Sequence, residues 1–343
     1  MTQISNPLPI EASSASLLRD LRKVEAVSPG LDTSVAVVIC IPSFRRPQHL
    51  RLTLQSLASQ RTGRRFALVI VENDAEGRES LAVAAEILER DTLRGLCVVE
   101  PRQGNCQAIN AAFETALATF AEAKHFLMID DDEIASPDWL ERMLQAAEAT
   151  GADVLGGPVW PHFDDAQHRD LSHHPAFRPA YDRSGPVPVI YGCGNCLIAR
   201  AVFDRLGLPA FDLRFNFLGG GDTDFFVRCR EAGMTFHWVA EAVITETVPR
   251  SRTNPAWIAM RGLRIGAINY HVQRKLAGTV WSQARLILKM LALLPLSLLR
   301  AVRIAWAERA ALIALHPVIV AAGGALAAIG VEPQPYKASK IRS

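Results

Sequence analysis

The sequence predicts an α/β domain built around a mostly parallel sheet with helices on both faces, followed by a C-terminal helical region. Three observations predict it: apolar runs alternate with amphipathic runs between residues 35 and 149, polar residues follow each apolar run, and the composition changes after Pro249. Alternating strand and helix patterns are typical of doubly wound sheets. The 343 residues exceed the roughly 250–300 at which one core stops growing, so we expect an appended part.

The predicted elements begin after a polar arm of residues 1–32. In that arm, the stretch from Ser16 to Val27 predicts either a poorly ordered segment or a surface helix. A β-branched apolar run over residues 35–41 then predicts a strand buried on both faces, which ends at Pro42. Helical spacing of leucines and further short apolar runs predict helix 47–60, strand 66–71, helix 79–90, strand 96–99, helix 106–120, strand 125–129 and helix 137–149.

After residue 150 the pattern becomes mixed. Residues 151–252 include a loop from Pro161 to Pro188 that is rich in His, Asp and Pro, and loops of this length are usually functional or disordered. We expect this half of the domain to recognise an acceptor. Residues 253–332 are basic and apolar and predict helices, and residues 333–343 form a basic tail that contains Lys337, Lys340 and Arg342.

Composition and charge exclude several classes of protein. A hydrophobic content of 49% excludes a disordered chain, and a net charge of +2 argues against a nucleic-acid binder. The six cysteines are scattered, and the first twenty residues hold no apolar leader. We therefore expect a reducing, cytosolic compartment without disulfides.

Polar residues cluster at the carboxyl ends of the predicted strands, where open parallel sheets bind ligands. They are Pro42–Arg46, Glu72–Asp74, Arg102–Asn105 and Asp130–Glu133. In the last of these, an apolar strand runs directly into four acids, a pattern that Mg²⁺ and Mn²⁺ favour. The alternative role, a helix cap, is already filled by Ser136, with Pro137 and Asp138 opening the next helix. A divalent metal at a strand end in turn implies a diphosphate ligand.

Other phosphate-binding patterns are absent from the sequence. There is no Gly-x-x-x-x-Gly-Lys-Ser/Thr loop and no Gly-x-Gly-x-x-Gly after the first strand. These absences disfavour a P-loop phosphotransferase and a dinucleotide dehydrogenase. A nucleotide-sugar remains as the candidate ligand.

Four motifs give the chain a family resemblance. They are Val38-Ile-Cys-Ile-Pro-Ser-Phe-Arg-Arg-Pro47, Val69-Ile-Val-Glu-Asn-Asp74, Asp130-Asp-Asp132 and Gly219-Gly-Gly-Asp-Thr-Asp-Phe-Phe226. In this order and spacing, over roughly residues 35–252, the sequence resembles family-2 glycosyltransferases, and especially bacterial exopolysaccharide glucosyltransferases of the succinoglycan-biosynthesis type. The resemblance implies a GT-A fold with a Rossmann-like sheet, a nucleotide-diphosphate-sugar donor, a divalent metal and inversion at the anomeric carbon.

The resemblance also assigns site residues. It implies that residues 33–150 bind the nucleotide-sugar and that residues 151–252 bind the acceptor and carry catalysis. The residues expected at the donor are Pro42, Ser43, Arg46, Glu72, Asn73, Gly104, Asn110, Asp130, Asp131 and Arg250. Those expected at the metal are Asp130, Asp132 and Glu246. Glu246 is expected at the end of a strand, and together with Arg250 and Arg252 it resembles a family stretch near the diphosphate. A place in a solvated loop is the alternative for Glu246.

Asp222 matches the aspartate that acts as the catalytic base in the family. Inverting transfer needs one carboxylate to accept the proton of the acceptor hydroxyl, while a metal stabilises the departing diphosphate. Asp222 also begins a predicted helix, so an N-cap is the alternative role, and Asp224 is the second candidate base. Gly221 stands where the family usually has Glu, which removes a neighbour that would orient the acceptor or the base.

Two further patterns invite a zinc interpretation. The first is Cys193-Gly-Asn-Cys196, but no second cysteine pair has suitable spacing, so reduced structural thiols are expected. The second is the histidine-bearing stretch from His162 to His174, which we expect to be an acceptor-side loop.

The C-terminal region predicts contact with a membrane surface. Apolar stretches at Leu286–Leu299 and Ala310–Val331 accompany many Arg and Lys residues. The second stretch is long enough to span a bilayer, but Pro317 and Gly323-Gly324 weaken it as a spanning helix. We expect peripheral or in-plane attachment to an anionic surface, the cytoplasmic face of the bacterial inner membrane. A spanning helix and a soluble core helix are the alternatives.

Together these observations predict an inverting, metal-dependent glycosyltransferase with Mn²⁺ or Mg²⁺ as cofactor. It would move a hexose, glucose from UDP-glucose, onto a lipid-linked oligosaccharide in exopolysaccharide or surface polysaccharide biosynthesis. The chain lacks the Gln-x-x-Arg-Trp motif of polymer-forming members, which predicts non-processive transfer. Two alternatives are a metal-dependent nucleotidyltransferase or diphosphate hydrolase, and a nucleotide-sugar-binding scaffold without turnover.

Overall fold

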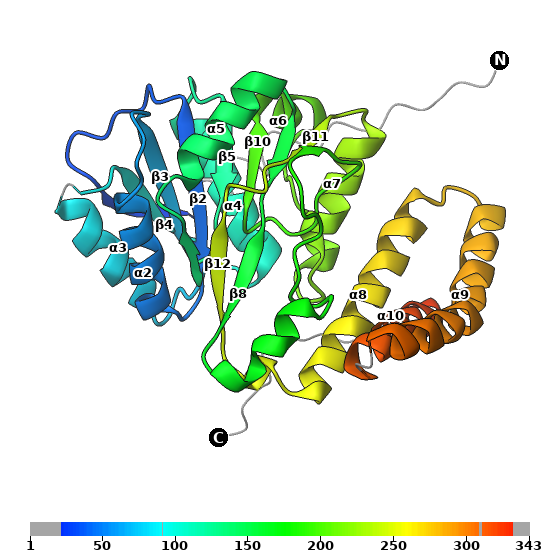
Figure 1. The fold of residues 1–343 in the computed structure, drawn as a ribbon. Coiled ribbons are helices and arrows are strands. Elements are labelled where there is room, and N and C mark those ends of the chain that lie inside the picture. Colours follow the sequence, from blue (N-terminus) through cyan, green and yellow to red (C-terminus); the bar gives the residue numbers. More distant parts are fainter. Residues whose placement is uncertain (1–21, 91, 309–310, 332–343) are drawn as a thin grey trace, which may run out of the picture.

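The computed structural model describes residues 22–90, 92–308 and 311–331. It contains a nine-stranded sheet, a small three-stranded sheet beside it and a C-terminal group of helices (Figure 1). The strands are β1 (Lys23–Val27), β2 (Val37–Ser43), β3 (Phe66–Glu72), β4 (Gly95–Val99), β5 (His125–Met128), β6 (Glu133–Ala135), β7 (Val154–Gly156), β8 (Val159–Phe163), β9 (Gly185–Pro186), β10 (Cys196–Ala199), β11 (Phe236–Trp238) and β12 (Ile244–Val248). The α-helices are α2 (Pro47–Ala58), α3 (Glu79–Glu89), α4 (Asn105–Thr119), α5 (Trp139–Thr150), α6 (Arg200–Leu206), α7 (Gly221–Glu231), α8 (Pro255–Leu276), α9 (Val280–Glu308) and α10 (Ala311–Ala328), and the short 3₁₀ helices are η1 (Ala166–His173), η2 (Leu213–Phe215) and η3 (Arg250–Arg252).

The large sheet has the order β1-β4-β3-β2-β5-β10-β7-β11-β9. Strands β4, β3, β2 and β5 are all parallel, as the sequence predicts, and the other half of the sheet is mixed. The register places Ser43 beside Glu72, and Glu72 beside Val99. The polar residues that follow these strands therefore meet at one edge of the sheet.

Two apolar cores cover the two faces of the sheet. The strand β2 is buried along its whole length, with Ile39 and Ile41 in one core and Val38 and Cys40 in the other. The first core contains residues of α2, α3 and α5, and the second contains residues of α4, α6 and α7. This coverage explains why β2 is a continuous apolar run, because a strand buried on both faces has no polar side.

The structure corrects three details of the predicted elements. Lys23–Val27 is an edge strand paired antiparallel with β4, so this part of the expected arm or surface helix is wrong; residues 1–21 lie outside the described residues. Pro42 does not end β2, which continues to Ser43. The helix α5 begins at Trp139 with Asp138 at its N-cap, so Ser136 is not the cap that we predicted.

The small sheet, in the order β6-β12-β8, carries acidic residues next to the end of β5. Glu246 lies in the middle of β12 rather than at a strand end, directly opposite Glu133 of β6. Two acids paired across antiparallel strands repel each other unless a cation compensates them.

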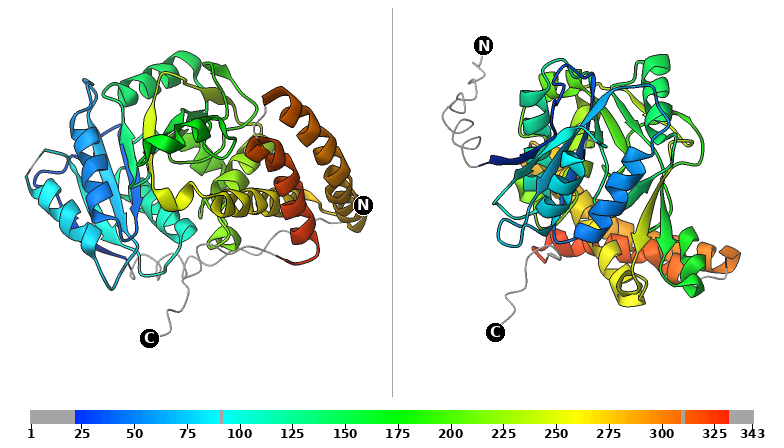
Figure 2. Two further views of the ribbon diagram at one scale, coloured as in Figure 1. Left: turned by 60° about the horizontal axis from the view of Figure 1, so that its bottom comes forward. Right: turned by 90° about the vertical axis from the view of Figure 1, so that its left-hand side faces the viewer.

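The C-terminal helices project from one side of the α/β domain (Figure 2). The helix α10 packs along both α8 and α9, and α8 also contacts α7 and η3. Glycines allow the close approach: a Cβ on Gly266 would collide with the carbonyl oxygen of Val320, and one on Gly323 with the carbonyl of Leu263. Pro295 lies inside α9, and the helix continues through it.

Among the described residues, one helix, Ala311–Ala328, is long and apolar enough to cross a membrane on length and composition alone. It contains Pro317 and both Gly323 and Gly324 without interruption. The basic tail after residue 332 lies outside the described residues.

Candidate functional site

The loop after β2 is tied to the acidic residues after β5. The Ser43 hydroxyl donates to Asp131 Oδ2 at 2.8 Å, and the Phe44 backbone N–H donates to the same oxygen at 3.2 Å. Arg46, at the N-cap of α2, donates to Asp131 Oδ1 at 3.1 Å and to Asp132 Oδ2 at 2.6 Å. Asp131 is buried, and its carboxylate holds the loop in place.

The acids after β5 repel one another. Burial raises the pKa of Asp130 well above its usual value, and the charges of Asp132, Asp131 and Glu246 raise it further. Burial and the charge of Asp130 likewise raise the pKa of Glu133, whose carboxylate accepts the Asp130 backbone N–H at 2.8 Å. Burial followed by the Asp132 charge raises the pKa of Glu246. The cluster lacks positive charge for the number of carboxylates that it holds.

This donor set fits a divalent cation. Carboxylate oxygens are the ligands that Mg²⁺ and Mn²⁺ prefer, and a dication would relieve the repulsion that raises these pKa values. Within the part of the chain that the structure describes, no three His, Cys, Asp or Glu side chains are already grouped as a metal cage. The fit therefore rests on the chemistry and mutual repulsion of Asp130, Asp132 and Glu246.

Arg252, which the resemblance places near the diphosphate together with Arg250, contacts the acidic cluster. Its Nη1 donates to Glu246 Oε1 at 2.6 Å, and its Nη2 lies 3.8 Å from Asp132 Oδ2. Arg250, which we expected at the donor, pairs instead with Asp165 at 3.2 Å and has 76% of its side chain exposed, against 24% for Arg252. Arg250 and Arg252 lie in the 3₁₀ helix η3, where three residues make a turn, so side chains two residues apart point in directions about 120° apart.

Glu72 and Asn73 are engaged with the protein's own backbone. Glu72, 1% exposed, accepts backbone N–H groups of Asp74, Ser80 and Leu81 at 2.9–3.2 Å, and burial raises its pKa. Asn73 donates to the carbonyls of Glu100 and Arg102 and accepts the Gly104 N–H at 2.8 Å. These side chains order the edge of the pocket.

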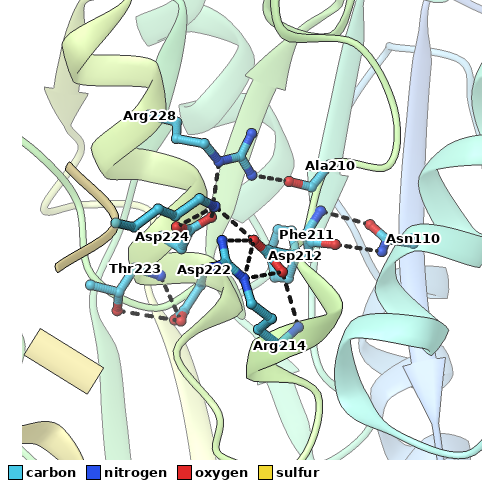
Figure 3. Close-up of polar contacts among 10 residues, drawn as sticks. Asn110, Ala210, Phe211, Asp212, Arg214, Asp222, Thr223, Asp224 and Arg228 are labelled. Carbon is cyan, nitrogen blue, oxygen red and sulfur yellow. Dashed lines mark hydrogen bonds and ion pairs between the residues drawn. The ribbon is translucent and has the colours of Figure 1, made fainter. Parts of the chain in front are cut away.

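Gly104 and Asn110 shape the start of α4. Gly104 is the N-cap with a φ of 133°, and a Cβ there would collide with the Asn216 side chain. Asn110 is buried and exchanges two hydrogen bonds with the backbone of Phe211, at 2.7 and 2.8 Å (Figure 3). Both residues join α4 to the segment that precedes Asp222.

Asp222 lies in the first turn of α7, whose N-cap is Gly220, so Asp222 is not the cap itself. Its Oδ1 accepts the Thr223 backbone N–H at 2.8 Å and the Thr223 hydroxyl at 3.4 Å (Figure 3). Burial raises the pKa of Asp222, while the Thr223 hydrogen bonds and the charge of Arg264 oppose the rise. A carboxylate with a raised pKa is a stronger base than an ordinary aspartate.

Asp224 lies on the same helix as Asp222 but has different partners (Figure 3). It is 1% exposed and pairs with Lys275 Nζ of α8 at 2.8 and 2.9 Å and with Arg228 Nε at 2.9 Å. Lys275 also pairs with Asp212 at 2.8 Å. Because both oxygens of Asp224 are held in ion pairs, the geometry favours a structural role for it over that of second candidate base.

Gly221 has no room for the family's usual glutamate. It is buried at the start of α7, and a Cβ there would lie 2.7 Å from Cys106 Sγ and 2.8 Å from the Phe211 ring. Cys106 and Phe211 therefore occupy the space that a side chain at position 221 would need.

The cysteine pair lies beside the acidic cluster, because a Cβ on Gly194, between the two cysteines in sequence, would collide with Glu133 Oε1. The thiols of Cys193 and Cys196 are free. Burial raises both of their pKa values first, followed by the charges of Asp130 and then Asp222. Both acids are thus close to the same two thiols, which brings the strand-end cluster and Asp222 to one region of the molecule.

The histidine-bearing stretch is not a single loop. His174 is buried, its Nδ1 accepts the Ala176 N–H at 3.0 Å, and its ring centroid lies 4.9 Å from that of His316 in α10. His162 belongs to β8 and His173 ends η1, both exposed. His174 is therefore a packing residue between this segment and the C-terminal helices.

Comparison with known proteins places this site in a family. Residues 38–207 match the family model described as Glycosyl transferase family 2. The succinoglycan biosynthesis protein ExoM of Rhizobium meliloti (strain 1021) is 31% identical over 242 residues, which cover 69% of this chain and 74% of that protein. An N-acetylglucosaminyltransferase of Rhizobium leguminosarum bv. phaseoli is 23% identical over 195 residues, 54% of this chain and 43% of that protein.

Solved structures share the fold. The mannosyltransferase PcManGT from Pyrobaculum calidifontis, in complex with GDP-Man and Mn²⁺, matches with a TM-score of 0.56 and 16% identity, over 88% of this chain and 90% of that chain. The S. aureus TarS fragment 1–349 in complex with UDP matches with a TM-score of 0.50 and 13% identity, over 84% and 89% of the chains. The fold is therefore GT-A, and the chain is a glycosyltransferase that belongs to glycosyl transferase family 2.

Proposed function

We propose that the chain is an inverting, metal-dependent, non-processive glycosyltransferase that moves a hexose from a UDP-sugar, with glucose as the favoured sugar, to a lipid-linked saccharide. The observation that carries this proposal is the pair of separate acidic sites: a cluster at the strand ends, and Asp222 close to it. Inverting transfer needs both, one for the diphosphate and one for the acceptor proton. ExoM, the relative named above, supports a place in exopolysaccharide biosynthesis.

The donor would lie along the edge of the sheet formed by Pro42, Ser43 and the turn after β3. In this proposal Arg46 and Arg252 release part of their hold on Asp132 and bind the diphosphate. Arg is well suited to this exchange, because its planar guanidinium pairs with carboxylate and phosphate in the same geometry. Residues 33–150 would thus hold the donor, and residues 151–252 would supply the base and the acceptor surface.

Asp130, Asp132 and Glu246 would hold Mn²⁺ or Mg²⁺. When bound, the dication supplies charge neutralisation to the departing diphosphate. The Mn²⁺ complex of PcManGT supports this choice of cofactor. Asp222 would accept the proton of the acceptor hydroxyl as the oxygen forms its bond to the anomeric carbon, and the bond from that carbon to the diphosphate breaks on the opposite side.

The acceptor is proposed to be membrane-bound. The apolar helices after η3 support this proposal, because an enzyme attached to a leaflet meets a lipid-linked substrate in two dimensions. We propose peripheral attachment to an anionic surface at the cytoplasmic face of the bacterial inner membrane.

The test is donor turnover. Purified protein is mixed with Mn²⁺, a panel of nucleotide-sugars and a lipid extract of the native host, and nucleotide diphosphate release is measured. We expect one donor to give acceptor-dependent release, which Asp222→Asn lowers by about 10²–10⁴-fold because the base is lost. The control Asp204→Asn makes the same change at an exposed position of α6 and should leave the rate unchanged.

Two outcomes would contradict the proposal. Release that needs no acceptor would favour a nucleotidyltransferase or diphosphate hydrolase. UDP binding without turnover, unaffected by Asp222→Asn, would favour a scaffold.

A further inference from the structure

Within the part of the chain that the structure describes, no protein covers one whole side of α9 between Val280 and Trp306. Between Val280 and Trp306 the buried residues of α9 form a narrow stripe: Leu286, Met290, Ser297 and Ala301, spaced four or seven residues apart. Opposite this stripe, at the same helical spacing, stand exposed apolar side chains. They are Trp281, Leu288, Leu291, Leu298, Leu299, Val302 and Trp306. Trp281 and Trp306, one near each end, are 80% and 88% exposed.

The cations of α9 lie along one side of this apolar face. Arg285, Lys289, Arg300 and Arg303 fall in adjoining rows of the helix, all four are exposed, and the sequence from Val280 to Ala307 contains no acid. A hollow of about 330 Å³ opens between α8 and α9 beside Arg285 and Lys289, with Ser282 and Gln273 in its wall. An apolar face bordered by cations, with a hollow of mixed polar and apolar lining next to it, matches a leaflet of anionic phospholipids.

We propose that α9 lies in the plane of an anionic membrane leaflet, its apolar face at the acyl-chain boundary and its four cations at the level of the phosphate headgroups. This proposal names the helix that makes the membrane attachment proposed above. It rests on the proposed function in one respect: the purpose of the attachment is to reach a lipid-linked acceptor. Aromatic residues at both ends fit this position, because Trp prefers the membrane interface.

A transverse orientation of α9 conflicts with its charges. The helix has 29 residues, or about 43 Å, against a hydrocarbon core of about 30 Å. Lys289 and Arg300 stand about 16 Å apart along the axis, so a spanning α9 would place at least one of them in the hydrocarbon. An in-plane helix keeps all four cations at the headgroups.

The helix α10 then acts as the support of α9. Its backbone touches that of α8 at Gly266 and Gly323, and α8 is joined to the catalytic domain through the Lys275–Asp224 ion pair. If α10 crossed the bilayer, α8 would follow it and bring Arg261 and Arg264 into the hydrocarbon.

The first experiment measures vesicle binding by flotation of the purified full chain, without donor or metal. Vesicles contain phosphatidylcholine alone or phosphatidylcholine mixed with phosphatidylglycerol. We expect the wild type to bind the mixed vesicles. Replacing the four cations by Gln should weaken this affinity at least about tenfold, because each cation near an anionic surface raises membrane affinity severalfold. A matched variant removes four exposed cations elsewhere and should bind within about twofold of the wild type; its substitutions are Arg61→Gln, Arg90→Gln, Lys124→Gln and Arg230→Gln.

The second experiment measures depth. Leu291→Trp is combined with Trp281→Phe and Trp306→Phe, and fluorescence is quenched with lipids that carry a spin label near the headgroup or near the chain end. An in-plane α9 gives stronger quenching by the shallow label at position 291, as for the native tryptophans at positions 281 and 306. A spanning α9 would place position 291 near the bilayer centre, where the deep label quenches more.

Three results would overturn the proposal: equal binding to both kinds of vesicle, no effect of the four cation replacements, or deeper quenching at position 291. A dimer in lipid-free buffer that Leu288→Gln with Leu299→Gln dissociates would assign the face to a second copy instead. Since no step uses donor turnover, a failure here leaves the proposed transfer reaction standing, and a failed transfer assay leaves this result standing.

Discussion

Asp222 shows how a single carboxylate acquires the properties of a base. Burial raises its pKa, while the Thr223 hydrogen bonds and Arg264 keep the rise in check. Asp224, two residues later, is locked in ion pairs with Lys275 and Arg228. The difference between the two acids comes from which side of α7 each occupies.

A pH dependence follows from the raised pKa of Asp222. The base must be ionised to accept a proton, so kcat/KM should fall as the pH is lowered through this pKa, above the ordinary aspartate value of about 3.9. The measurement is kcat/KM against pH, with UDP affinity followed over the same range to separate binding from catalysis. An acid limb that merely follows UDP affinity would count against Asp222 as its source.

Arg252 and Arg250 offer a matched pair of variants. Arg252→Gln removes a cation beside Asp132 and Glu246, and we expect donor affinity to fall about 10–100-fold, as for a lost charged hydrogen bond of about 1.5–3 kcal/mol. Arg250→Gln, at an exposed position, should change it by less than about twofold. Donor affinity is measured by calorimetric titration with the UDP-sugar. Equal losses of affinity for the two variants would contradict the assignment of Arg252 to the donor site.

At the scale of elements, α8 connects chemistry to attachment. Its N-terminus follows η3, which carries Arg252, and its C-terminal turn carries Lys275, which pairs with Asp224 of α7. Along its length, Gly262 and Gly266 receive α10. The helix α8 is thus joined to three parts of the molecule: η3 with Arg252, α7 with Asp222, and α10, which supports α9.

The contact between α8 and α10 predicts a steric effect. Gly266→Ala would force a Cβ into the backbone of α10, where Gly324 N is 2.6 Å away, and should destabilise the protein by about 1–3 kcal/mol. Thermal unfolding followed by circular dichroism should show a Tm lowered by a few degrees. The control Gly278→Ala, with no atom within 4 Å of its Cβ, should not lower it. An unchanged Tm for Gly266→Ala would mean that the two helices do not pack this closely in solution.

At the scale of the whole molecule, the acidic cluster brings together parts that are distant in the chain. Asp130 and Asp132 come from the end of β5, Glu246 from β12 and Arg252 from η3. In our proposal, a cation and a diphosphate relieve the repulsion among these acids. Ligand binding should therefore be visible in stability as well as in turnover.

We expect Mn²⁺ together with UDP to raise the Tm, because a ligand at 100 times its Kd stabilises the folded state by about 2.7 kcal/mol. A chelator should cancel the rise and abolish sugar transfer. Asp132→Asn should reduce the Mn²⁺-dependent part of the shift. A shift that UDP alone produces in full, with chelator present, would speak against a metal on Asp130 and Asp132.

The sequence by itself determined the α/β alternation, the parallel strands β2 to β5 and the gathering of polar residues at their carboxyl ends. These follow from local patterns, since a buried strand has no polar side and ligands bind where parallel strands end. The motifs also led to the family. The sequence did not predict the strand Lys23–Val27, because this short edge strand is almost entirely exposed and has no continuous apolar run.

Only the tertiary structure decided which side chains share the site. Three of its features depend on segments far apart in the chain. Glu246 lies opposite Glu133, and Arg252 pairs with Glu246 while Arg250 is exposed. Asp224 is held in an ion pair by Lys275 of another helix. The same holds for Gly221, whose lack of a side chain is explained by Cys106 and Phe211 from other elements. Local sequence sets the period of each element, but contacts between elements set the direction in which each functional side chain points.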